Sequence, residues 1–362
     1  MRIVMFYHTL VSDWNHGNAH FLRGVATELL SCGHDVSIFE PKDSWSRLNL
    51  VSEHGDKPIR RFHEAYPMLE SSPYQLETLI LDEALDGADL VIVHEWSDHS
   101  LVSRVGEHRK RAGRYRLLFH DTHHRMITDR KSMDAYDLSG YDGVLAYGQV
   151  LADMYRQTGR VKRVWTWHEA ADTRVFRPIP SQELEGDLVW VGNWGDDERT
   201  QELHEFLIEP AKSLKLRARV YGVRYPLEAQ NALADADIEY GGWLPNFDAP
   251  EVFSRFKFTV HVPRRPYVRA LPGIPTIRPF EALACGIPLI CSPWNDAEDL
   301  FTPGKDFLIA NNGREMREQM SAVLSNRKLA RSLAEHGLKS IQQFHTCRHR
   351  VDELLRIYQE LT

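Results

Sequence analysis

Residues 273–290 hold the side chains best suited to bind a small anionic molecule. Pro279 favours the start of a helix and Gly286 favours a left-handed helix end, so these two residues predict one short helix between them. Glu281 then falls in the first turn, where a carboxylate can accept hydrogen bonds from both hydroxyls of a ribose. Arg278 precedes the helix and suits a phosphate, together with the free N–H groups of the helix start. The alternative is that Glu281 only offsets the helix dipole and that Arg278 is a solvated charge.

Two further polar groups have the composition of metal sites but not the spacing. His120 and His124 are four residues apart, which aligns ligands only on a helix, and here the pair follows a predicted strand. Asp235 and Asp237 form a DxD in a helix-to-strand connection, where a solvated turn is the simpler interpretation. The sequence lacks a GxGxxG after its first strand and has no Walker A motif. We therefore expect no bound metal and no cofactor.

The elements that must position these residues form two series of alternating strands and helices. Short apolar runs bounded by turn residues alternate with amphipathic stretches, the pattern of repeated βα units around parallel sheets. Cys32-Gly33 ends the first helix, predicted at Asn18 to Leu30. The predicted strands are Ile3–Tyr7, His34–Phe39, Asp89–Val93, Arg116–His120 and Gly143–Tyr147, then Asp187–Val191, Arg217–Tyr221, Phe258–Val262, Pro288–Cys291 and Asp306–Ile309.

A Pro- and charge-rich segment, residues 176–185, separates the two series and suits a linker. We place the first domain at residues 1–178 and the second at 179–346. Residues 347–362 form one amphipathic helix that we expect to pack back on the first domain. The expected fold is α/β, with two Rossmann-like doubly wound domains facing a cleft.

Composition narrows the class of partner. The 362 residues include 44 Lys+Arg and 51 Asp+Glu, a formal charge of −7, which does not fit nucleic acid as the principal partner. There is neither a secretory signal nor an apolar stretch long enough to span a membrane, and the four cysteines lack CxxC spacing, so a cytoplasmic location is the simplest expectation. The basic stretch 108–116 suits either weak contact with an anionic membrane or a solvated helix end.

Residues 278–290, Arg-Pro-Phe-Glu-Ala-Leu-Ala-Cys-Gly-Ile-Pro-Leu-Ile, resemble the nucleotide-sugar site of GT-B glycosyltransferases of the family 4 type (glycosyl transferases group 1), and most closely the CgeB-like branch. Weaker similarities extend the resemblance over nearly the whole chain, at residues 18–36, 172–178, 192–199 and 221–226. One departure stands out, because family 4 enzymes usually carry a second glutamate eight positions before Glu281, and that position is Gly273. The resemblance therefore implies that backbone groups or another residue contact the donor sugar.

Carried over by matching positions, the resemblance implies a donor site in the second domain. Glu281 would hold the ribose, and Arg199, near a helix start, would neutralise the leaving diphosphate without a metal. The alternative for Arg199 is a surface ion pair with Asp196 or Asp197. Trp243 suits either the base or a core position. The other expected donor-side residues line the diphosphate and sugar (Thr276, Ile277, Arg278), face the diphosphate (Gly192, Asn193) or flank the base (Tyr221, Gly222, Gly242, Leu244).

In the first domain, residues 118–125 resemble the family's His-bearing loop. His120 would lie beside the reacting sugar carbon, and we expect His120, Glu281 and Arg199 to carry catalysis; the alternative for His120 is an ordinary buried histidine. Gly17 and Asn18 would approach the diphosphate from the first helix start. Loop residues suited to an acceptor, by stacking on a sugar or by acting as a base, are Trp14, His94, Glu95 and Trp96; rim packing and a solvated carboxylate are the alternatives.

These expectations converge on one activity. The resemblance implies a hexosyltransferase-like enzyme that moves a sugar from a nucleoside diphosphate sugar, a UDP-sugar by preference, to an unidentified glycan, lipid, protein or small-molecule acceptor. It implies a retaining reaction without a metal. The alternatives are a nucleotide-sugar epimerase and a non-catalytic nucleotide-sugar-binding protein of the same fold.

Overall fold

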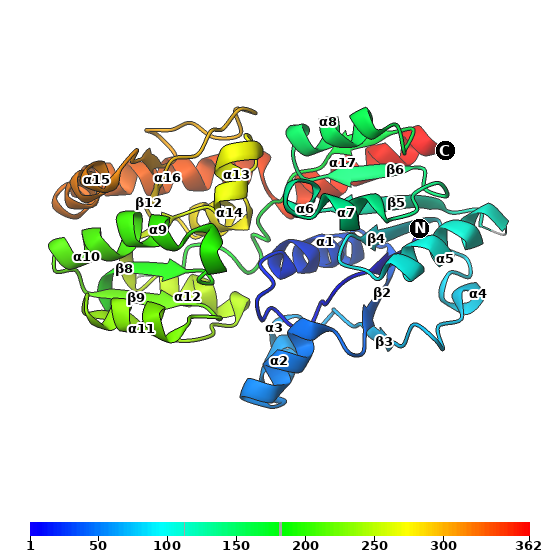
Figure 1. Ribbon diagram of the computed structural model, residues 1–362, viewed down its shortest axis with the longest axis horizontal. Coiled ribbons are helices and arrows are strands. Elements are labelled where there is room, and N and C mark those ends of the chain that lie inside the picture. Colours follow the sequence, from blue (N-terminus) through cyan, green and yellow to red (C-terminus); the bar gives the residue numbers. More distant parts are fainter. Residues whose placement is uncertain (112, 181–182) are drawn as a thin grey trace. The chain divides into compact units, whose positions relative to one another are not determined.

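The computed structural model describes residues 1–111, 113–180 and 183–362 and divides into two compact units (Figure 1). Unit 1 contains residues 1–169 and 347–362, and unit 2 contains residues 170–346. The boundary expected from the sequence, between residues 178 and 179, lies a few residues after this division. Each unit has one parallel sheet with helices around it, which confirms the predicted α/β fold with two Rossmann-like domains.

The sheet of unit 1 has seven parallel strands in the order β3-β2-β1-β4-β5-β6-β7. Its central strands are continuous apolar runs, as expected for strands that helices cover on both faces, and β1, β4 and β5 are almost wholly buried. The strands are β1 (Arg2–Phe6), β2 (Asp35–Pro41), β3 (Ser72–Tyr74), β4 (Leu90–His94), β5 (Arg116–Asp121), β6 (Gly143–Ala146) and β7 (Val164–Thr166).

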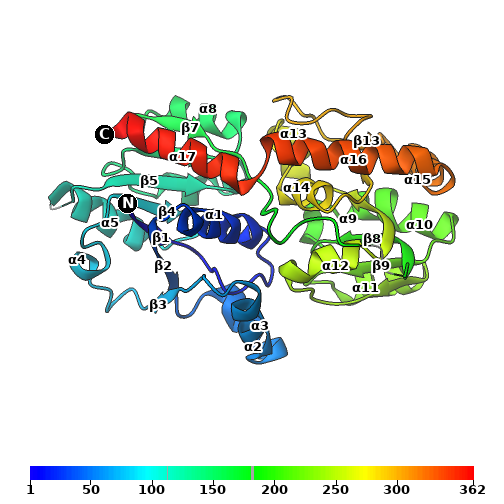
Figure 2. The ribbon, with the colours of Figure 1, turned by 180° about the vertical axis from the view of Figure 1, so that it is seen from behind.

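Nine helices accompany this sheet in the described residues of unit 1. They are α1 (Ala19–Ser31), α2 (Trp45–His54), α3 (Lys57–Ala65), α4 (Leu81–Ala84), α5 (His99–Arg111), α6 (Arg125–Thr128), α7 (Arg130–Asp134), α8 (Gln149–Thr158) and α17 (Cys347–Leu361). The C-terminal helix α17 packs along α1, and Arg348 Nη1 reaches Glu28 Oε1 at 3.1 Å between them (Figure 2). Gly33 follows α1 with φ +80°, so the predicted left-handed stop is confirmed.

The sheet of unit 2 has six parallel strands in the order β10-β9-β8-β11-β12-β13. Leu188, Trp190, Phe258 and Val260 on the central strands belong to its hydrophobic core. The strands are β8 (Gly186–Val191), β9 (Ala218–Tyr221), β10 (Ile238–Tyr240), β11 (Phe256–His261), β12 (Leu289–Cys291) and β13 (Leu308–Ile309).

The helices of unit 2 differ widely in length, and the segment between β8 and β9 contains four short helical pieces. These are the 3₁₀ turn η1 (Asp196–Glu198), α9 (Thr200–Leu203), the π-helical η2 (His204–Ile208) and α10 (Glu209–Ser213). The remaining elements are α11 (Leu227–Ala234), the 3₁₀ turn η3 (Asn246–Asp248), α12 (Ala249–Phe253), α13 (Arg265–Ala270), α14 (Ile277–Ala284), α15 (Gly313–Ser325) and α16 (Arg327–Phe344).

All ten predicted strands are present, and the three strands that the sequence did not predict are β3, β7 and β10. Each has three residues and lies at the edge of its sheet, where one side lacks a neighbour. These three strands carry too little apolar pattern to be recognised, whereas β13, which also lies at an edge, was predicted. Among the described residues, no helix is both long enough and apolar enough to cross a membrane.

Candidate functional site

The strands of each sheet are parallel, so the loops that follow them meet at one edge, the carboxyl edge. In unit 2 this edge carries the loop after β8, the end of β11 and the start of α14. In unit 1 it carries the loops after β1, β4 and β5. We describe each edge by itself.

Arg199 is the most tightly held cation of the unit 2 edge. Its guanidinium donates to the backbone carbonyls of Val262 (Nη1, 2.9 Å), Trp194 (Nε, 3.3 Å) and Asn193 (Nη2), and its Cζ lies 5.1 Å from the ring centroid of Trp190. Burial, and then the positive charge of Arg264, lowers the pKa of Arg199. The side chain therefore carries a positive charge that backbone dipoles hold in place, rather than the surface ion pair considered from the sequence.

Two further arginines, Arg264 and Arg278, lie close enough to act electrostatically on Arg199. Arg264 Nη1 pairs with Glu198 Oε2 at 2.7 Å, and Arg278 Nη1 pairs with Glu281 Oε2. We call Arg199, Arg264 and Arg278 the arginine cluster. Neighbouring guanidinium groups at a sheet edge have the charge and the N–H donors that an anion requires.

Glu281 is 0% exposed, and both of its carboxylate oxygens have partners within unit 2. Oε1 accepts from Asn246 Nδ2 at 2.6 Å, and Oε2 accepts from Arg278. The prediction that Glu281 lies in the first helical turn is wrong, because α14 begins at Ile277 and Glu281 is in the second turn. Pro279 lies within the first turn instead of opening the helix, which costs nothing because first-turn N–H groups have no intrahelical acceptor.

Thr276, immediately before α14, has φ +59° and ψ 178°, a backbone conformation that β-branched residues rarely adopt. Its Oγ1 lies 3.4 Å from Nε2 of His261, the last residue of β11. Burial, and then the charges of Arg199 and Arg278, lowers the pKa of His261 to about 3, so the ring is neutral at pH 7. His261 Nδ1 is buried and has no hydrogen-bond partner among the described residues.

His261 was missed by the sequence reasoning although its position carried a signal. It ends a predicted strand of the second series, at the edge where ligands bind in open parallel sheets. Arg264 was missed as well, and Asn246 carried no local signal because it is 35 residues from Glu281.

The glycines expected at the diphosphate and base lie against one another. A Cβ on Gly222 would be 2.1 Å from the carbonyl oxygen of Gly192, so the two loops touch through bare backbone. Asn193 Oδ1 accepts from the Val223 N–H at 2.9 Å, and the Gly222 N–H donates to the Gly242 carbonyl at 2.8 Å. The structure thus brings together the ends of β8, β9 and β10.

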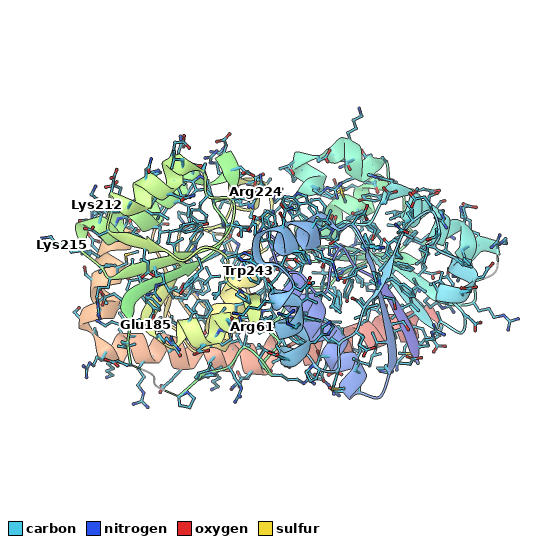
Figure 3. All side chains as sticks on the ribbon, turned by 90° about the horizontal axis from the view of Figure 1, so that it is seen from below. Arg61, Glu185, Lys212, Lys215, Arg224 and Trp243 are labelled. Atoms are coloured by element: carbon cyan, nitrogen blue, oxygen red, sulfur yellow. The ribbon has the colours of Figure 1, made fainter. Side chains whose placement is uncertain are left out.

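Of the other residues expected on the donor side, Ile277 is buried at the start of α14, whereas Tyr221, Trp243 and Leu244 are half-buried. Tyr221 Oη accepts from Arg219 Nη1 at 3.3 Å. Trp243 lies on the loop after β10 (Figure 3). Its half-buried position is compatible with the base-flanking role and does not fit a fully packed core residue.

Gly273 has φ +87°, and the space that its side chain would occupy is taken by Glu298. A Cβ on Gly273 would lie 2.7 Å from both Cγ and Oε1 of Glu298. The two loops are joined by hydrogen bonds from the Gly273 N–H to the Asn295 carbonyl (2.8 Å) and from Trp294 Nε1 to the Ile274 carbonyl (3.0 Å). A carboxylate from residue 298 is therefore present where the sequence has a glycine.

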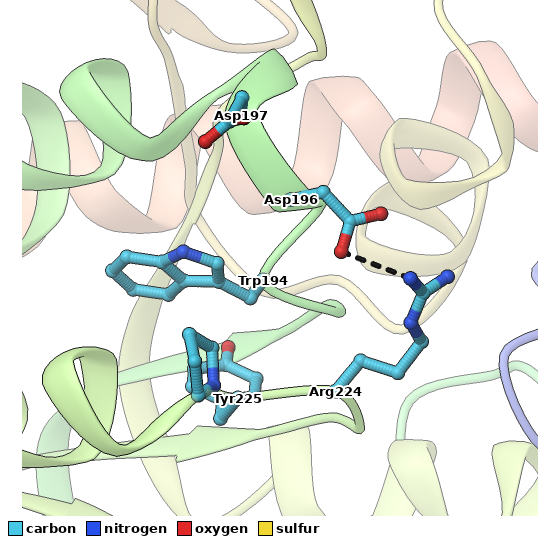
Figure 4. Close-up of a pocket in the computed structure, with 6 residues that line it drawn as sticks. Trp194, Asp196, Asp197, Arg224 and Tyr225 are labelled. Carbon is cyan, nitrogen blue, oxygen red and sulfur yellow. Dashed lines mark hydrogen bonds and ion pairs between the residues drawn. The ribbon is translucent and has the colours of Figure 1, made fainter.

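A cavity of about 510 Å³ lies beside the loops after β8 and β9 (Figure 4). It is lined by Trp194, Asp196, Asp197, Arg224, Tyr225 and Pro226. Arg224 Nη2 pairs with Asp196 Oδ1 at 3.0 Å, and both residues have positive φ, 61° and 51°. Because Asp196 pairs with Arg224, it does not neutralise Arg199.

At the carboxyl edge of unit 1, His94 is the centre of a hydrogen-bond chain. The Trp96 N–H donates to His94 Nδ1 at 3.4 Å, and His94 Nε2 lies 3.0 Å from Thr122 Oγ1. Asn18 Nδ2 also donates to Thr122 Oγ1, and Asn18 precedes α1. Gly17 is half-buried in the same loop.

His120 is 1% exposed and is enclosed by aromatic rings. Its ring centroid lies 4.8 Å from that of Trp167, 6.0 Å from that of Phe21 and 5.4 Å from that of His94. Burial lowers the pKa of His120 to about 3, and neither ring nitrogen has a hydrogen-bond partner among the described residues. A neutral imidazole with two unused nitrogens at a strand end is a costly feature for a group that only fills space.

Glu95 directly follows β4, Asp121 is the last residue of the neighbouring strand β5, and both are fully buried. Arg125 Nη1 pairs with Glu95 Oε2 at 3.0 Å, and Tyr155 Oη donates to Asp121 Oδ2 at 2.7 Å. Burial, and then the Asp121 charge, raises the pKa of Glu95, and burial raises the pKa of Asp121 to about 6. The alternative of a solvated carboxylate at Glu95 is therefore wrong.

Trp14, another residue considered for an acceptor, is buried and donates from Nε1 to Glu53 Oε2 at 2.8 Å, so its indole N–H is already used. Three basic residues of the stretch 108–116 pair with carboxylates: Arg109 with Asp142, Lys110 with Glu107 and Arg111 with Asp82; residue 112 lies outside the described residues. Across the described ranges, no group of three His, Cys, Asp or Glu side chains is arranged to hold a metal ion.

Comparison with known proteins identifies the fold. The family model described as "Glycosyl transferase-like" matches residues 199–356, which is less than half of the chain. No curated protein matches the sequence significantly.

Solved structures match over nearly the whole chain. They include sucrose-phosphate synthase from Thermosynechococcus elongatus (TM-score 0.67, 13% identity, 99% of this chain and 98% of that chain). HepE from Anabaena in complex with UDP and glucose has TM-score 0.68, 11% identity and 99% coverage of both chains. An alpha-glucosyltransferase in complex with UDP and a 13-mer DNA has TM-score 0.69, 14% identity and 99% coverage of both chains. At these identities the likeness establishes the fold alone, which is the GT-B fold of glycosyltransferases.

Proposed function

We propose that this protein is a glycosyltransferase that moves a sugar, a hexose by class, from a nucleoside diphosphate sugar to a hydroxyl-bearing acceptor without a metal ion. The observation that carries the proposal is the arginine cluster at the carboxyl edge of unit 2. Arg199 is held there by three carbonyl groups, and the described residues place no carboxylate in contact with it. The match of residues 199–356 to a glycosyltransferase-like family supports the same conclusion.

In this proposal the arginine cluster binds the diphosphate. Departure of a nucleoside diphosphate leaves negative charge on its terminal phosphate, and fixed cations stabilise that charge without a metal. Arg199 suits this task because its hydrogen bonds fix the guanidinium before the ligand arrives, so little reorganisation is needed. The Gly192 and Asn193 backbone would contact the diphosphate from the loop after β8, with Thr276, Ile277 and Arg278 opposite.

Glu281 would hold the ribose, and the hydrogen bonds that Glu281 already makes limit how a ribose can bind. Because Asn246 and Arg278 already bond its two oxygens, a ribose hydroxyl must either use a remaining lone pair or replace one partner. Movement of Arg278 from Glu281 to the diphosphate would free a carboxylate oxygen for the ribose and supply a cation to the phosphates. The base would lie against Tyr221, Gly222, Trp243 and Leu244.

Glu298 would supply the sugar-binding carboxylate that Gly273 lacks. Its side chain occupies the space of the absent Cβ, and the two hydrogen bonds between its loop and residues 273–274 hold that arrangement. A carboxylate accepts hydrogen bonds from sugar hydroxyls and so orients the ring for departure of the diphosphate.

On the acceptor side, His120 would contact the reacting sugar, with Gly17 and Asn18 near the diphosphate. A neutral imidazole can accept a bond from a sugar hydroxyl or donate one as charge develops at the anomeric carbon. The resemblance found in the sequence favours retention of configuration and a UDP-sugar donor. Two of the structural neighbours named above support the donor class, since both were solved with UDP.

The direct test is calorimetric titration of the full chain with UDP, GDP, dTDP and their glucose conjugates, with and without a chelator. We expect one nucleotide to bind, the chelator to have no effect, and Arg199→Met to weaken binding at least about tenfold. Arg331→Met is the matched control, because Arg331 pairs with Glu335 on the surface of α16. Absence of nucleotide binding would overturn the proposal, and product analysis with the bound donor separates transfer from epimerisation or binding alone.

A further inference from the structure

The carboxyl edge of unit 1 contains a row of four imidazoles, of which the proposed donor site uses only His120. Ring centroids are 5.5 Å apart between His8 and His16, 6.5 Å between His16 and His94, and 5.4 Å between His94 and His120. His8 and His16 lie in the loop after β1, His94 is the last residue of β4 and His120 lies near the end of β5, and these three strands are neighbours in the sheet. We call this row, with Trp96 beside it, the imidazole row.

The hydrogen bonds of His94 leave the hydroxyl of Thr122 as a hydrogen-bond donor. Since the Trp96 N–H donates to Nδ1, the neutral ring carries its proton on Nε2 and donates it to Thr122 Oγ1. Thr122 Oγ1 also accepts from Asn18, so both of its lone pairs are used. Its own O–H is left as a donor.

His16 provides the complementary acceptor. It is 8% exposed, it bonds the backbone of Thr9, and Nε2 has no hydrogen-bond partner among the described residues. The bond to Thr9 therefore uses Nδ1–H, and the neutral ring leaves Nε2 as an acceptor. His120 adds one donor and one acceptor, because neither of its nitrogens has a partner among the described residues.

Among the described residues of this edge, the nearby guanidinium groups of Arg23 and Arg125 are already bonded. Arg23 pairs with Asp13 at 2.9 Å and donates to the carbonyls of Leu10 and Val11, and Arg125 pairs with Glu95. A phosphate oxygen is an acceptor only and would oppose His16 Nε2 without a cation to balance its charge. A hydroxyl group is both donor and acceptor and matches the alternation of groups in the imidazole row.

Trp96 supplies an apolar surface at the margin of the row. It is 41% exposed, its ring centroid lies 6.1 Å from that of His8, and Arg125 Cζ lies 4.6 Å from its ring. An indole held in this way suits the C–H face of a sugar ring.

We propose that the imidazole row and Trp96 bind a neutral, hydroxyl-rich molecule, a saccharide by class, and that this molecule is the acceptor. The inference rests on the proposed function for its role as acceptor. Binding of the saccharide itself is independent of the arginine cluster, because the residues that carry it all belong to unit 1.

The test uses saturation-transfer NMR on the full chain saturated with UDP. The probes are glucose, galactose, maltose and lactose, with glucose 6-phosphate as the charged counterpart. We expect at least one neutral saccharide to bind more tightly than glucose 6-phosphate. His16→Phe and Trp96→Ala should each weaken it about tenfold, the loss of roughly one hydrogen bond or one stacked ring.

Three comparisons make the result decisive. Trp45→Ala is the matched control, since Trp45 is 47% exposed in the same unit and packs on Trp14, and it should leave saccharide binding unchanged. Trp96 is surface-accessible, so Trp96→Ala remains informative if His16→Phe does not fold. Binding that Glu298→Gln abolishes and Trp96→Ala preserves would assign the saccharide to unit 2 and overturn the inference.

Two other outcomes would also overturn it: glucose 6-phosphate binding as tightly as the neutral sugars, or none of the saccharides binding. Titration of the same variants with UDP keeps the two proposals apart. In His16→Phe and Trp96→Ala, loss of saccharide binding with UDP affinity intact is the expected result. In the unmodified protein, UDP binding without saccharide binding refutes the acceptor inference alone, whereas absence of UDP binding refutes the proposed function.

Discussion

The carboxyl edges of the two units share an architecture and differ in charge. Each follows buried parallel strands, and each contains a buried histidine, His120 or His261, whose pKa is lowered to about 3 chiefly by burial. Around His261 the neighbours are the arginine cluster, whereas around His120 they are aromatic rings and a second neutral imidazole. In the proposals made above, one edge binds an anion and the other a neutral partner, and the side chains rather than the fold make this distinction.

Buried carboxylates show the same contrast. Glu281 in unit 2 has one arginine and one amide partner, so its charge is balanced locally. In unit 1 a single guanidinium, that of Arg125, faces both Glu95 and Asp121, whose pKa values are raised. Both edges therefore contain a carboxylate paired with arginine, but only at the unit 1 edge do two buried carboxylates share one guanidinium among the described residues and have raised pKa values.

Arg278→Met should have the largest effect, because it leaves the Glu281 charge buried without its cation. We expect the free energy of unfolding of unit 2 to fall by about 3–5 kcal/mol and UDP binding to be lost. Thermal unfolding and calorimetry measure the two effects. The double variant Arg278→Met/Glu281→Gln should recover most of the stability but none of the binding; recovery of UDP binding would show that the arginine cluster does not hold the diphosphate.

Acid should destabilise unit 1 through its histidines. A histidine with a folded pKa of about 3 and an unfolded pKa near 6.5 adds nothing above pH 6.5, but the unfolded state gains protons as pH falls toward 3. Each such group costs about 1.4 kcal/mol per pH unit in that window. Asp121, with its pKa raised to about 6, opposes the trend between pH 6 and 4.

His120→Phe isolates one share of this effect. Between pH 6.5 and 4.5 the free energy of unfolding should fall less steeply for the variant than for the unmodified protein. The difference between the two slopes should be about 1.4 kcal/mol per pH unit. At pH 7.5 the variant should be about 1–2 kcal/mol more stable, since it removes a buried polar group without partners, yet it should lose transferase activity. Denaturant titrations at several pH values measure both, with exposed His336→Gln as control; an unchanged slope and a lower stability would make His120 an ordinary core residue.

Thr276→Gly should stabilise unit 2 modestly. Relief of the positive φ gains about 1–3 kcal/mol, and the extra chain entropy of glycine costs about 0.5–1 kcal/mol, so a net gain of about 1 kcal/mol is expected. UDP affinity should fall, because the loop before α14 becomes less fixed. Asp237→Gly, at φ +56° in a turn outside the carboxyl edge, is the matched control and should gain stability with UDP affinity unchanged. A lower melting temperature for Thr276→Gly would show that the conformation is not strained.

The smallest expected effect is that of salt, which should weaken UDP binding at the unit 2 edge and leave saccharide binding at the unit 1 edge unchanged. Raising ionic strength screens the arginine cluster, so the UDP dissociation constant should increase by about threefold to tenfold between low and high salt. Binding of a neutral saccharide to the imidazole row should not change. Calorimetry and saturation-transfer NMR on the same sample measure both, and equal salt dependence would remove the distinction between the edges.

The sequence by itself determined the order of the elements, because that order depends on local pattern. Apolar runs of five or six residues with turn residues beside them specified the central strands, and Gly33 and Gly286 ended helices at left-handed positions. The C-terminal helix was placed at its observed bounds by its apolar stripe alone. The edge strands β3, β7 and β10 were not predicted because half of their surroundings are solvent. The predicted start of the helix that contains Glu281 was two residues too far along the chain, because proline is tolerated anywhere in a first turn and Pro279 therefore does not mark the first helical residue.

Only the tertiary structure decided which polar side chains lie next to one another. The pairing of Asn246 with Glu281, the position of Glu298 in the space beside Gly273, and the row of imidazoles at the ends of three strands join residues far apart in the chain. No local spacing encodes such contacts, since they follow from how loops pack once parallel strands have brought their carboxyl ends together. Burial then sets the protonation of His120 and His261, and burial is a property of the folded chain rather than of any segment.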